Sequence, residues 1–372
     1  MSVAVVISQV LPSPADSRVK AREAKGLYIP SLDGIRAVAV TIVFAAHAGL
    51  DKIVPGGFGV TVFFFLSGFL ITSLLRHEHA RTGGINLRKF YLRRMLRIWP
   101  PMYITLGVVG TLCALGVFGL AKPQLEPLLF QVFHLANYHQ IFGQGQSMPG
   151  TGILWSLAVE EHFYLIWPVF FAFLFGRVSL ARLGIVLAVA CVAVLAWRCA
   201  LVWWWHADEW RTYAATDTRI DSIMYGCILA LCCNPCMDRF GKPSGWRMYA
   251  ILVLSSLLLL ATFAIRLPAF RETFRYSLQG LALLPLFYIA VSRPDWGVFR
   301  WLNWRAVRFV GSLSYSIYLS HFFVLSVLST GLRNQPSWVI AVIAAIITLL
   351  FALAMHVVIE RPLAVFRRQL HA

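Results

Sequence analysis

Residues 57–75 read GFGVTVFFFLSGFLITSLL, a stretch without a single charged side chain. A helix that crosses the core of a bilayer needs about 20 mostly apolar residues, and several other segments of the chain have the same character. Of the 372 residues, 59% are hydrophobic and only 13% are charged, and the mean hydropathy is +0.71. Soluble domains carry about 25% charged residues. The sequence therefore predicts an all-α, polytopic membrane protein.

About ten segments bounded by Gly, Pro or charge are predicted to span the membrane. Closed barrels are excluded, because they show a weak alternation of apolar and polar residues and not unbroken apolar runs. A further segment, residues 123–141, is amphiphilic and is expected to be re-entrant or interfacial. The predicted spans lie near residues 32–50, 57–75, 98–120, 152–175, 181–205, 219–233, 248–265, 276–292, 309–330 and 337–358.

The distribution of Lys and Arg predicts the orientation. With the N-terminus inside, 23 of these side chains fall on the cytoplasmic side and 7 outside, which is the bias of the positive-inside rule. Both termini are thus expected in the cytoplasm. Residues 1–26 show no cleavable signal peptide and are expected to be a disordered tail, with 27–365 as the transmembrane domain and 366–372 as a second tail. The net charge of +17 has its source in cytoplasmic loops, and no nucleic-acid partner is expected.

The seven cysteines do not indicate a metal or redox centre. Most of them lie in apolar stretches, where Cys behaves as a small hydrophobe. The cluster Cys232-Cys233-Asn-Pro-Cys236 has no second Cys/His pair nearby, as a metal site would need. No bound metal is predicted.

The first predicted span carries Arg36 and His47, which are eleven positions apart. Eleven residues make about three helical turns, so both side chains point the same way, about 16 Å apart along the axis. Arg36 is expected in the cytoplasmic half of the span and His47 in the outer half. Ionisable groups inside a membrane are costly and by default line a pathway or a site.

Three arginines, Arg93, Arg94 and Arg97, precede the third predicted span on its cytoplasmic side. Their guanidinium groups could hold phosphates by bidentate contacts. Plain anchoring by the positive-inside rule is the alternative, and it requires charge but no particular spacing.

The fourth predicted span places Glu160 and Glu161 beside His162 in an apolar helix, which is expensive unless these groups are paired or face water. Glu160 and Tyr164 share a face through their i, i+4 spacing. Glu160 is therefore a candidate site residue.

Other polar residues are candidates for lining a substrate site, each with a structural alternative. His321 is either part of the site or a satisfied core histidine. Asp221 could instead pair locally with Arg219, and Glu360 could form a helix-terminal salt bridge. The candidates of this kind are Asp33, Ser67, Asp221, His321 and Glu360.

An ordered series of short motifs resembles the acyltransferase family 3 membrane proteins, the O-acetylases of lipopolysaccharide, peptidoglycan, exopolysaccharide and nodulation factors. Each motif is weak alone, but the ordered set covers residues 27–365 and is specific. The motifs are Leu32-Asp33-Gly34-Ile-Arg36-Ala37 with His47, Gly57 to Ile71, Arg93-Arg94-x-x-Arg97-Ile-x-Pro100, Trp155-Ser156-Leu157-x-x-Glu160-Glu161, Leu313-Ser314-Tyr315-Ser316-Ile-Tyr318-Leu-x-His321, and Glu360-Arg361-Pro362.

The resemblance implies transfer of an acyl group, expected to be acetyl, from cytoplasmic acyl-CoA to a hydroxyl of an extracytoplasmic glycan or glycolipid, in a bacterial inner membrane. It implies that His47 is catalytic with Arg36 as its partner, and that Arg94 and Arg97 contact the phosphates of coenzyme A. His47 could act as a general base or as a nucleophile, and Glu160 could orient its ring. Many relatives carry an additional hydrolase-like domain; here the acceptor is expected to be bound by membrane helices and short loops.

Two other classes of function remain as alternatives. The chain could be a transporter of a lipid-linked sugar or of protons, although no internal repeat of the kind common in transporters is visible. It could also be an inactive scaffold. The Arg36/His47 pair argues against this alternative, because a scaffold does not need two ionisable residues on one face of a membrane helix. The oligomeric state is not predicted.

Overall fold

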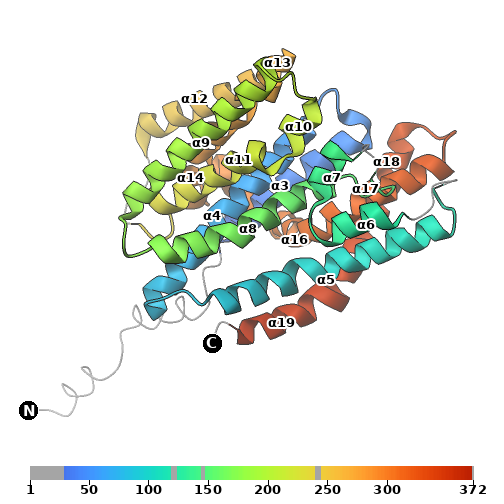
Figure 1. Ribbon diagram of the computed structural model, residues 1–372, viewed down its shortest axis with the longest axis horizontal. Coiled ribbons are helices and arrows are strands. Elements are labelled where there is room, and N and C mark those ends of the chain that lie inside the picture. The colour runs from blue at the N-terminus through green and yellow to red at the C-terminus, as the bar shows by residue number, and fades with distance from the viewer. Residues whose placement is uncertain (1–28, 119–123, 144–146, 239–243, 371–372) are drawn as a thin grey trace, which may run out of the picture.

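The computed structural model describes residues 29–118, 124–143, 147–238 and 244–370, so the predicted tail at 1–26 lies outside the described residues. The described chain is helical throughout and contains no strand, only an isolated bridge between Phe175 and Val178. The long helices run roughly side by side in one bundle (Figure 1). The all-α prediction is confirmed.

The helices fall into long elements and short connecting ones. The long ones are α3 (Pro30–Ala45), continued by the π-helix η1 (Ala46–Leu50), α4 (Gly56–Thr82), α5 (Leu87–Ala114), α8 (Leu154–Leu174), α9 (Leu180–Trp203), α11 (Thr216–Cys232), α12 (Gly245–Ala264), α14 (Phe274–Ser292), α17 (Ser314–Gly331) and α18 (Ser337–Met355). The short ones are α6 (Leu125–Val132), α7 (Ala136–Phe142), α10 (Glu209–Ala214), α13 (Pro268–Glu272), α15 (Gly297–Arg300), η2 (Trp301–Asn303), α16 (Arg305–Ser312), η3 (His356–Glu360) and α19 (Arg361–Gln369).

Seven described helices are long and apolar enough to cross a membrane, and eight are if the bent pair α16–α17 forms one span. The axes of that pair differ by 67°. The two remaining predicted spans correspond to α5 and α11. α5 opens with a run of basic residues, and α11 has 17 residues, at the lower limit for a span. The structure thus supports a multi-pass protein, whereas the count of ten rests on the sequence alone.

The centre of the bundle is α4, which packs against α3, α8, α11 and α14. Glycines bring α4 and α11 into backbone contact. A Cβ added to Gly68 would lie 2.0 Å from the carbonyl oxygen of Ile223, and one added to Gly226 would lie 2.0 Å from that of Phe65. Small residues at helix crossings are the usual means of close packing in membranes, and this crossing fixes the core around the site.

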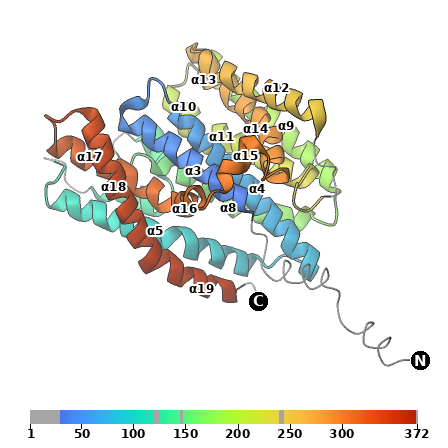
Figure 2. The ribbon, with the colours of Figure 1, turned by 180° about the vertical axis from the view of Figure 1, so that it is seen from behind.

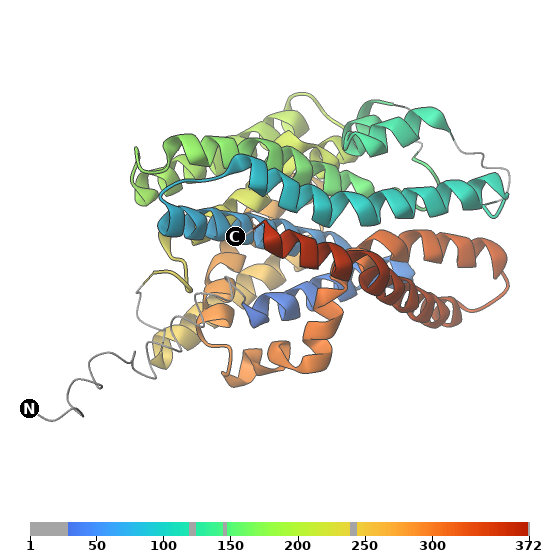
Figure 3. The ribbon, with the colours of Figure 1, turned by 90° about the horizontal axis from the view of Figure 1, so that it is seen from below.

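Peripheral helices present apolar side chains outward. In α12 and in α18 with its continuation to Arg367, only 17% and 22% of the most apolar window is buried inside the molecule. Such a large exposed apolar surface is expected where lipid tails replace water. α19 continues α18 through η3 and lies along α5, near the C-terminus (Figures 2 and 3).

The segment predicted to be re-entrant or interfacial forms two short helices. α6 and α7 have 8 and 7 residues, too few to cross a bilayer. They are joined at His134, which has a positive φ of 57°. α7 packs against α8, the helix that carries Glu160.

Candidate active site

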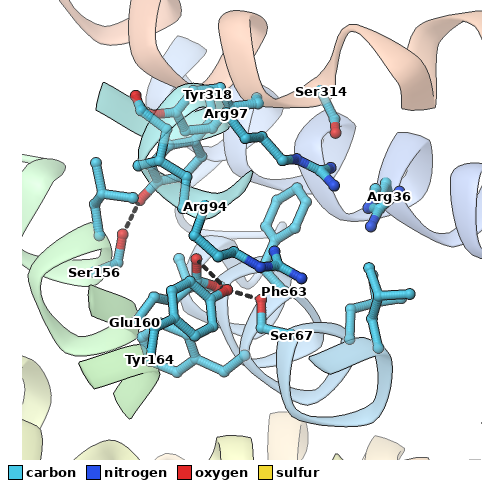
Figure 4. Close-up of a pocket in the computed structure, with 17 residues that line it drawn as sticks. Arg36, Phe63, Ser67, Arg94, Arg97, Ser156, Glu160, Tyr164, Ser314 and Tyr318 are labelled. Carbon is cyan, nitrogen blue, oxygen red and sulfur yellow. Dashed lines mark hydrogen bonds between the residues drawn. The ribbon is translucent and has the colours of Figure 1, made fainter. Parts of the chain in front are cut away.

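A small pocket near the middle of the bundle gathers three arginines from two helices (Figure 4). α3 contributes Arg36, and α5 contributes Arg94 and Arg97. The cavity has a volume of about 110 Å³, and the exposed Arg97 lies at its surface. Its apolar wall comes largely from α4. We call this cavity the arginine pocket.

Hydrogen bonds to Glu160 order the floor of the arginine pocket. Ser67 donates to Oε1 at 2.7 Å, and Tyr164 donates to Oε2 at 3.3 Å, which agrees with the predicted shared face of α8. Arg94 lies 5.3 Å above the ring of Tyr164. Within the described chain neither Arg94 nor Arg97 forms an ion pair. The pocket can therefore supply guanidinium groups to an anionic ligand.

The other charged residues predicted near this pocket have partners of their own. Arg36 donates to Asp33 at 2.9 Å. Arg93 does not face the pocket; it pairs with Glu78 at 2.8 Å and donates to the carbonyl of Leu370. The structure thus brings together Arg94 and Arg97 of the predicted trio and leaves Arg93 outside.

His47 lies at the other end of the first span, on the π-helix η1, in which Gly49 has a positive φ of 102°. Its Nδ1 is 2.9 Å from Nε2 of His321, and the two rings have centroids 5.1 Å apart and planes 25° apart. The expectation that Glu160 orients this ring is not met, because Glu160 bonds to Ser67 and Tyr164. His321 of α17 takes that place.

The hydrogen bonds of His321 assign the tautomers of both rings. His321 is fully buried, and its Nδ1 faces the carbonyl of Tyr318 at 2.7 Å. A carbonyl only accepts, so Nδ1 carries the proton, and the neutral ring that burial favours has an unprotonated Nε2. That atom accepts from His47, so the proton of His47 is on Nδ1. Nε2 of His47 is then left with a free lone pair, the form needed by a base or a nucleophile.

A second, larger cavity of about 870 Å³ contains His47 in its wall. Its lining comes from the turn after η1, from α10, from α13 and from the starts of α8 and α14. Aromatic and basic side chains are both numerous there. We call it the histidine cavity.

The linings of the two cavities share two residues, Val60 of α4 and Tyr318 of α17. The hydroxyl of Tyr318 lies 2.6 Å from that of Ser156 and 3.2 Å from the carbonyl of Ile153. Tyr318 was not among the predicted site residues, although it stands three positions before His321 and so shares its helix face. It separates the arginines from the histidine pair.

Asp221 and Glu360, like Asp33, Arg93 and His321, do not line either cavity. Asp221 is fully buried and pairs with Arg198 of α9 at 2.7 Å, so the predicted local pair with Arg219 is wrong. Residues at i, i+2 on a helix do not face each other. Arg219 instead lies 3.9 Å from the ring centre of Tyr276.

Glu360 is also away from the cavities. It accepts from Ser316 at 2.6 Å and lies 2.9 Å from Nδ1 of His356. The described residues contain no group of three or more His, Cys, Asp or Glu that could hold a metal ion.

These features define a class: a polytopic helical membrane protein with an internal site in which arginines and a tautomer-fixed histidine line two adjoining cavities. The family model described as an acyltransferase domain matches residues 29–357. The chain belongs to acyltransferase family 3.

Several bacterial relatives match most of this chain. A Staphylococcus aureus (strain COL) protein described as a candidate O-acetyltransferase is 31% identical over 92% of the chain. The peptidoglycan O-acetyltransferase of Listeria monocytogenes is 28% identical over 90%, and a candidate peptidoglycan O-acetyltransferase of Bacillus subtilis is 32% identical over 90%. The matches cover 58%, 56% and 55% of these relatives, so the chain spans little more than half their length. No solved structure matches.

Proposed function

We propose that the chain is a membrane O-acyltransferase that moves an acetyl group from cytoplasmic acetyl-CoA to a hydroxyl of an extracytoplasmic, peptidoglycan-like glycan. One observation carries the proposal: the arginine pocket and the histidine cavity share the lining residues Val60 and Tyr318. The family and the names of the relatives support the reaction class. The proposed topology has ten spans, including α5 and α11, with both termini in the cytoplasm.

The arginine pocket is the proposed donor site. Coenzyme A carries several phosphates and a long flexible arm that ends in the thioester. A cavity of about 110 Å³ is small beside the 300 Å³ or more typical of sites that enclose a whole ligand. Arg94 and Arg97 therefore hold phosphates at its edge, while the arm passes Arg36 and brings the thioester to Tyr318.

His47 is the proposed general base. As the acceptor oxygen attacks the thioester carbon, Nε2 of His47 takes the hydroxyl proton. The new C–O bond forms, the C–S bond breaks, and the imidazolium returns the proton to the sulfur of coenzyme A. A nucleophilic His47 would use the same lone pair to form an acyl-imidazole, which a rapid quench followed by mass spectrometry of the labelled chain would detect.

The test uses inverted membrane vesicles supplied with radiolabelled acetyl-CoA, with label on lumenal glycan as the readout. His47→Ala is expected to lower the transfer rate by about 10²–10⁴-fold, the usual contribution of a positioned base. Arg97→Ala should raise the apparent KM for acetyl-CoA about tenfold, as loss of a charge-assisted hydrogen bond does. Arg93→Ala, which removes an arginine paired with Glu78 outside the pocket, is the matched comparison and should change KM less than about twofold.

Two results would contradict the proposal. A wild-type transfer rate in His47→Ala would show that His47 is not the general base. Movement of a lipid-linked sugar by the wild-type chain without any acyl-CoA, together with no acyl transfer, would instead support the transporter.

A further inference from the structure

The histidine cavity is lined by several basic side chains, although it lies on the outer side of the membrane in the proposed topology, where basic residues are fewest. Seven Lys and Arg fall outside in that topology, and four of them line this one cavity: Lys52, Arg266, Arg271 and Arg275. The positive-inside rule disfavours Lys and Arg in short outer loops. Their concentration at one place indicates a local role.

These four cations are not neutralised by ion pairs within the described chain. Arg275 donates to the hydroxyl of Tyr276 at 2.8 Å, and its Nε is buried without a hydrogen-bond partner. Arg266 donates to the backbone carbonyl of Lys52 at 3.2 Å. Arg271 and Arg275 therefore retain donors that a carboxylate or phosphate can fill.

Acidic residues reduce this charge without cancelling it. Asp51 and Glu209 also line the cavity, which leaves a net charge of +2 from four basic and two acidic side chains. Glu272 lies close enough to interact with Arg271 and Arg275 but is not part of the lining. The cavity thus has an excess of positive charge around His47.

Aromatic rings line the same cavity. They include Trp155, Trp210, Tyr213, Phe263 and Phe322. Flat apolar ring faces with polar edges suit the C–H faces and hydroxyls of sugar rings. A volume of about 870 Å³ accommodates a ligand larger than one small molecule.

We propose that the acceptor is an acidic saccharide, whose carboxylate or phosphate is bound by Arg271 and Arg275 while a sugar hydroxyl lies at Nε2 of His47. This inference rests on the proposed function and names the substrate class of the same site. The inference places acceptor recognition on α13, α14 and the turn after η1. These elements lie near α10 at one end of the bundle (Figure 1).

The test measures binding, so that it does not depend on transfer. The full chain in nanodiscs of uncharged lipid is titrated with a uronic acid tetrasaccharide and with its carboxyl-reduced, neutral counterpart. A phosphorylated tetrasaccharide and its phosphatase product form the second arm and distinguish phosphate from carboxylate. Microscale thermophoresis gives Kd for the wild type and for Arg271→Gln, Arg275→Gln and Glu209→Gln. Arg333→Gln, an outer arginine that does not line the cavity, is the matched control.

The wild type is expected to bind at least one acidic tetrasaccharide about tenfold more tightly than its neutral counterpart. Arg271→Gln and Arg275→Gln should each weaken acidic binding about 3–10-fold and leave neutral binding unchanged. Glu209→Gln should tighten acidic binding about twofold, a change of sign that general damage to the fold would not produce. Arg333→Gln should have no effect.

Three results would overturn the inference: equal affinity for acidic and neutral sugars in both arms, the same loss in Arg333→Gln as in Arg271→Gln, or displacement of the acidic sugar by coenzyme A from the histidine cavity. If the wild type binds acidic sugar as expected but transfers no acetyl group, the acidic saccharide site stands and the proposed reaction fails.

Discussion

Replacement of His321 by alanine tests whether the tautomer of His47 matters. In His321→Ala the Nδ1 proton of His47 loses its acceptor at 2.9 Å, and the ring can rotate or exchange its tautomer. One buried hydrogen bond contributes about 0.5–1.5 kcal/mol, equivalent to roughly 2–12-fold in rate. Loss of ring orientation adds to this, so we expect kcat to fall about 10–100-fold. The upper bound is the loss of about 10²–10⁴-fold expected for removing the base itself.

The effect should fall on kcat and not on the apparent KM for acetyl-CoA, because His321 does not line the arginine pocket. The assay is initial-rate transfer from radiolabelled acetyl-CoA in reconstituted vesicles at saturating donor. Thermal unfolding of the same preparation controls for packing damage, since His321 is fully buried.

His321→Gln provides the conservative comparison. A glutamine can donate its amide N–H to the carbonyl of Tyr318 and accept from His47 through its oxygen. The fall in log kcat relative to wild type should therefore be smaller in His321→Gln than in His321→Ala by at least about a third. Wild-type kcat in His321→Ala, or a rise in KM with kcat unchanged, would refute the role of His321 as the residue that positions the base.

Three further outcomes follow from the packing. Gly68→Ala should destabilise the fold by about 1–3 kcal/mol in thermal unfolding, because its Cβ would lie 2.0 Å from a backbone oxygen of α11. Gly107→Ala is the control: this position has open space around it, so the substitution should be neutral or slightly stabilising. Asp221→Asn should cost about 3–5 kcal/mol in the same assay, because it leaves Arg198 buried and uncompensated; unchanged stability would mean that water reaches this pair. Val60→Phe puts a larger side chain where the two cavities share a lining residue. It should abolish acyl transfer, while coenzyme A still binds with a Kd within about threefold of wild type. Normal transfer would show that the acyl group takes another route.

The features of the site that depend on one helix could be predicted from the sequence in part. The spacing of Arg36 and His47 predicted that both point the same way from the first span, and in the structure Arg36 lines the arginine pocket and His47 the histidine cavity. Helical geometry also accounts for the position of Arg93 outside the arginine pocket, because adjacent residues of a helix are turned about 100° from each other. The sequence analysis nevertheless predicted the three arginines together.

Features that depend on contacts between distant segments could not be predicted in this way. His47 and His321 are 274 positions apart, and Asp221 meets Arg198 across two helices. No helical periodicity relates such positions, because tertiary packing sets them. The number of spans could not be predicted for a related reason: α11 has only 17 residues but is mostly buried by neighbouring helices, and α5 begins with a run of basic residues.

The junction at Val60 and Tyr318 has a consequence for the energy stored across the membrane. Each elementary charge that moves across 100 mV releases about 2.3 kcal/mol, and a continuous aqueous pore wide enough for coenzyme A would let small ions dissipate that gradient. In the proposed reaction, two cavities that share one tyrosine and one valine in their linings would let a two-carbon group cross while the bulk of its carrier stays behind. The proposed export of an acetyl group would then be compatible with an electrically insulating bilayer.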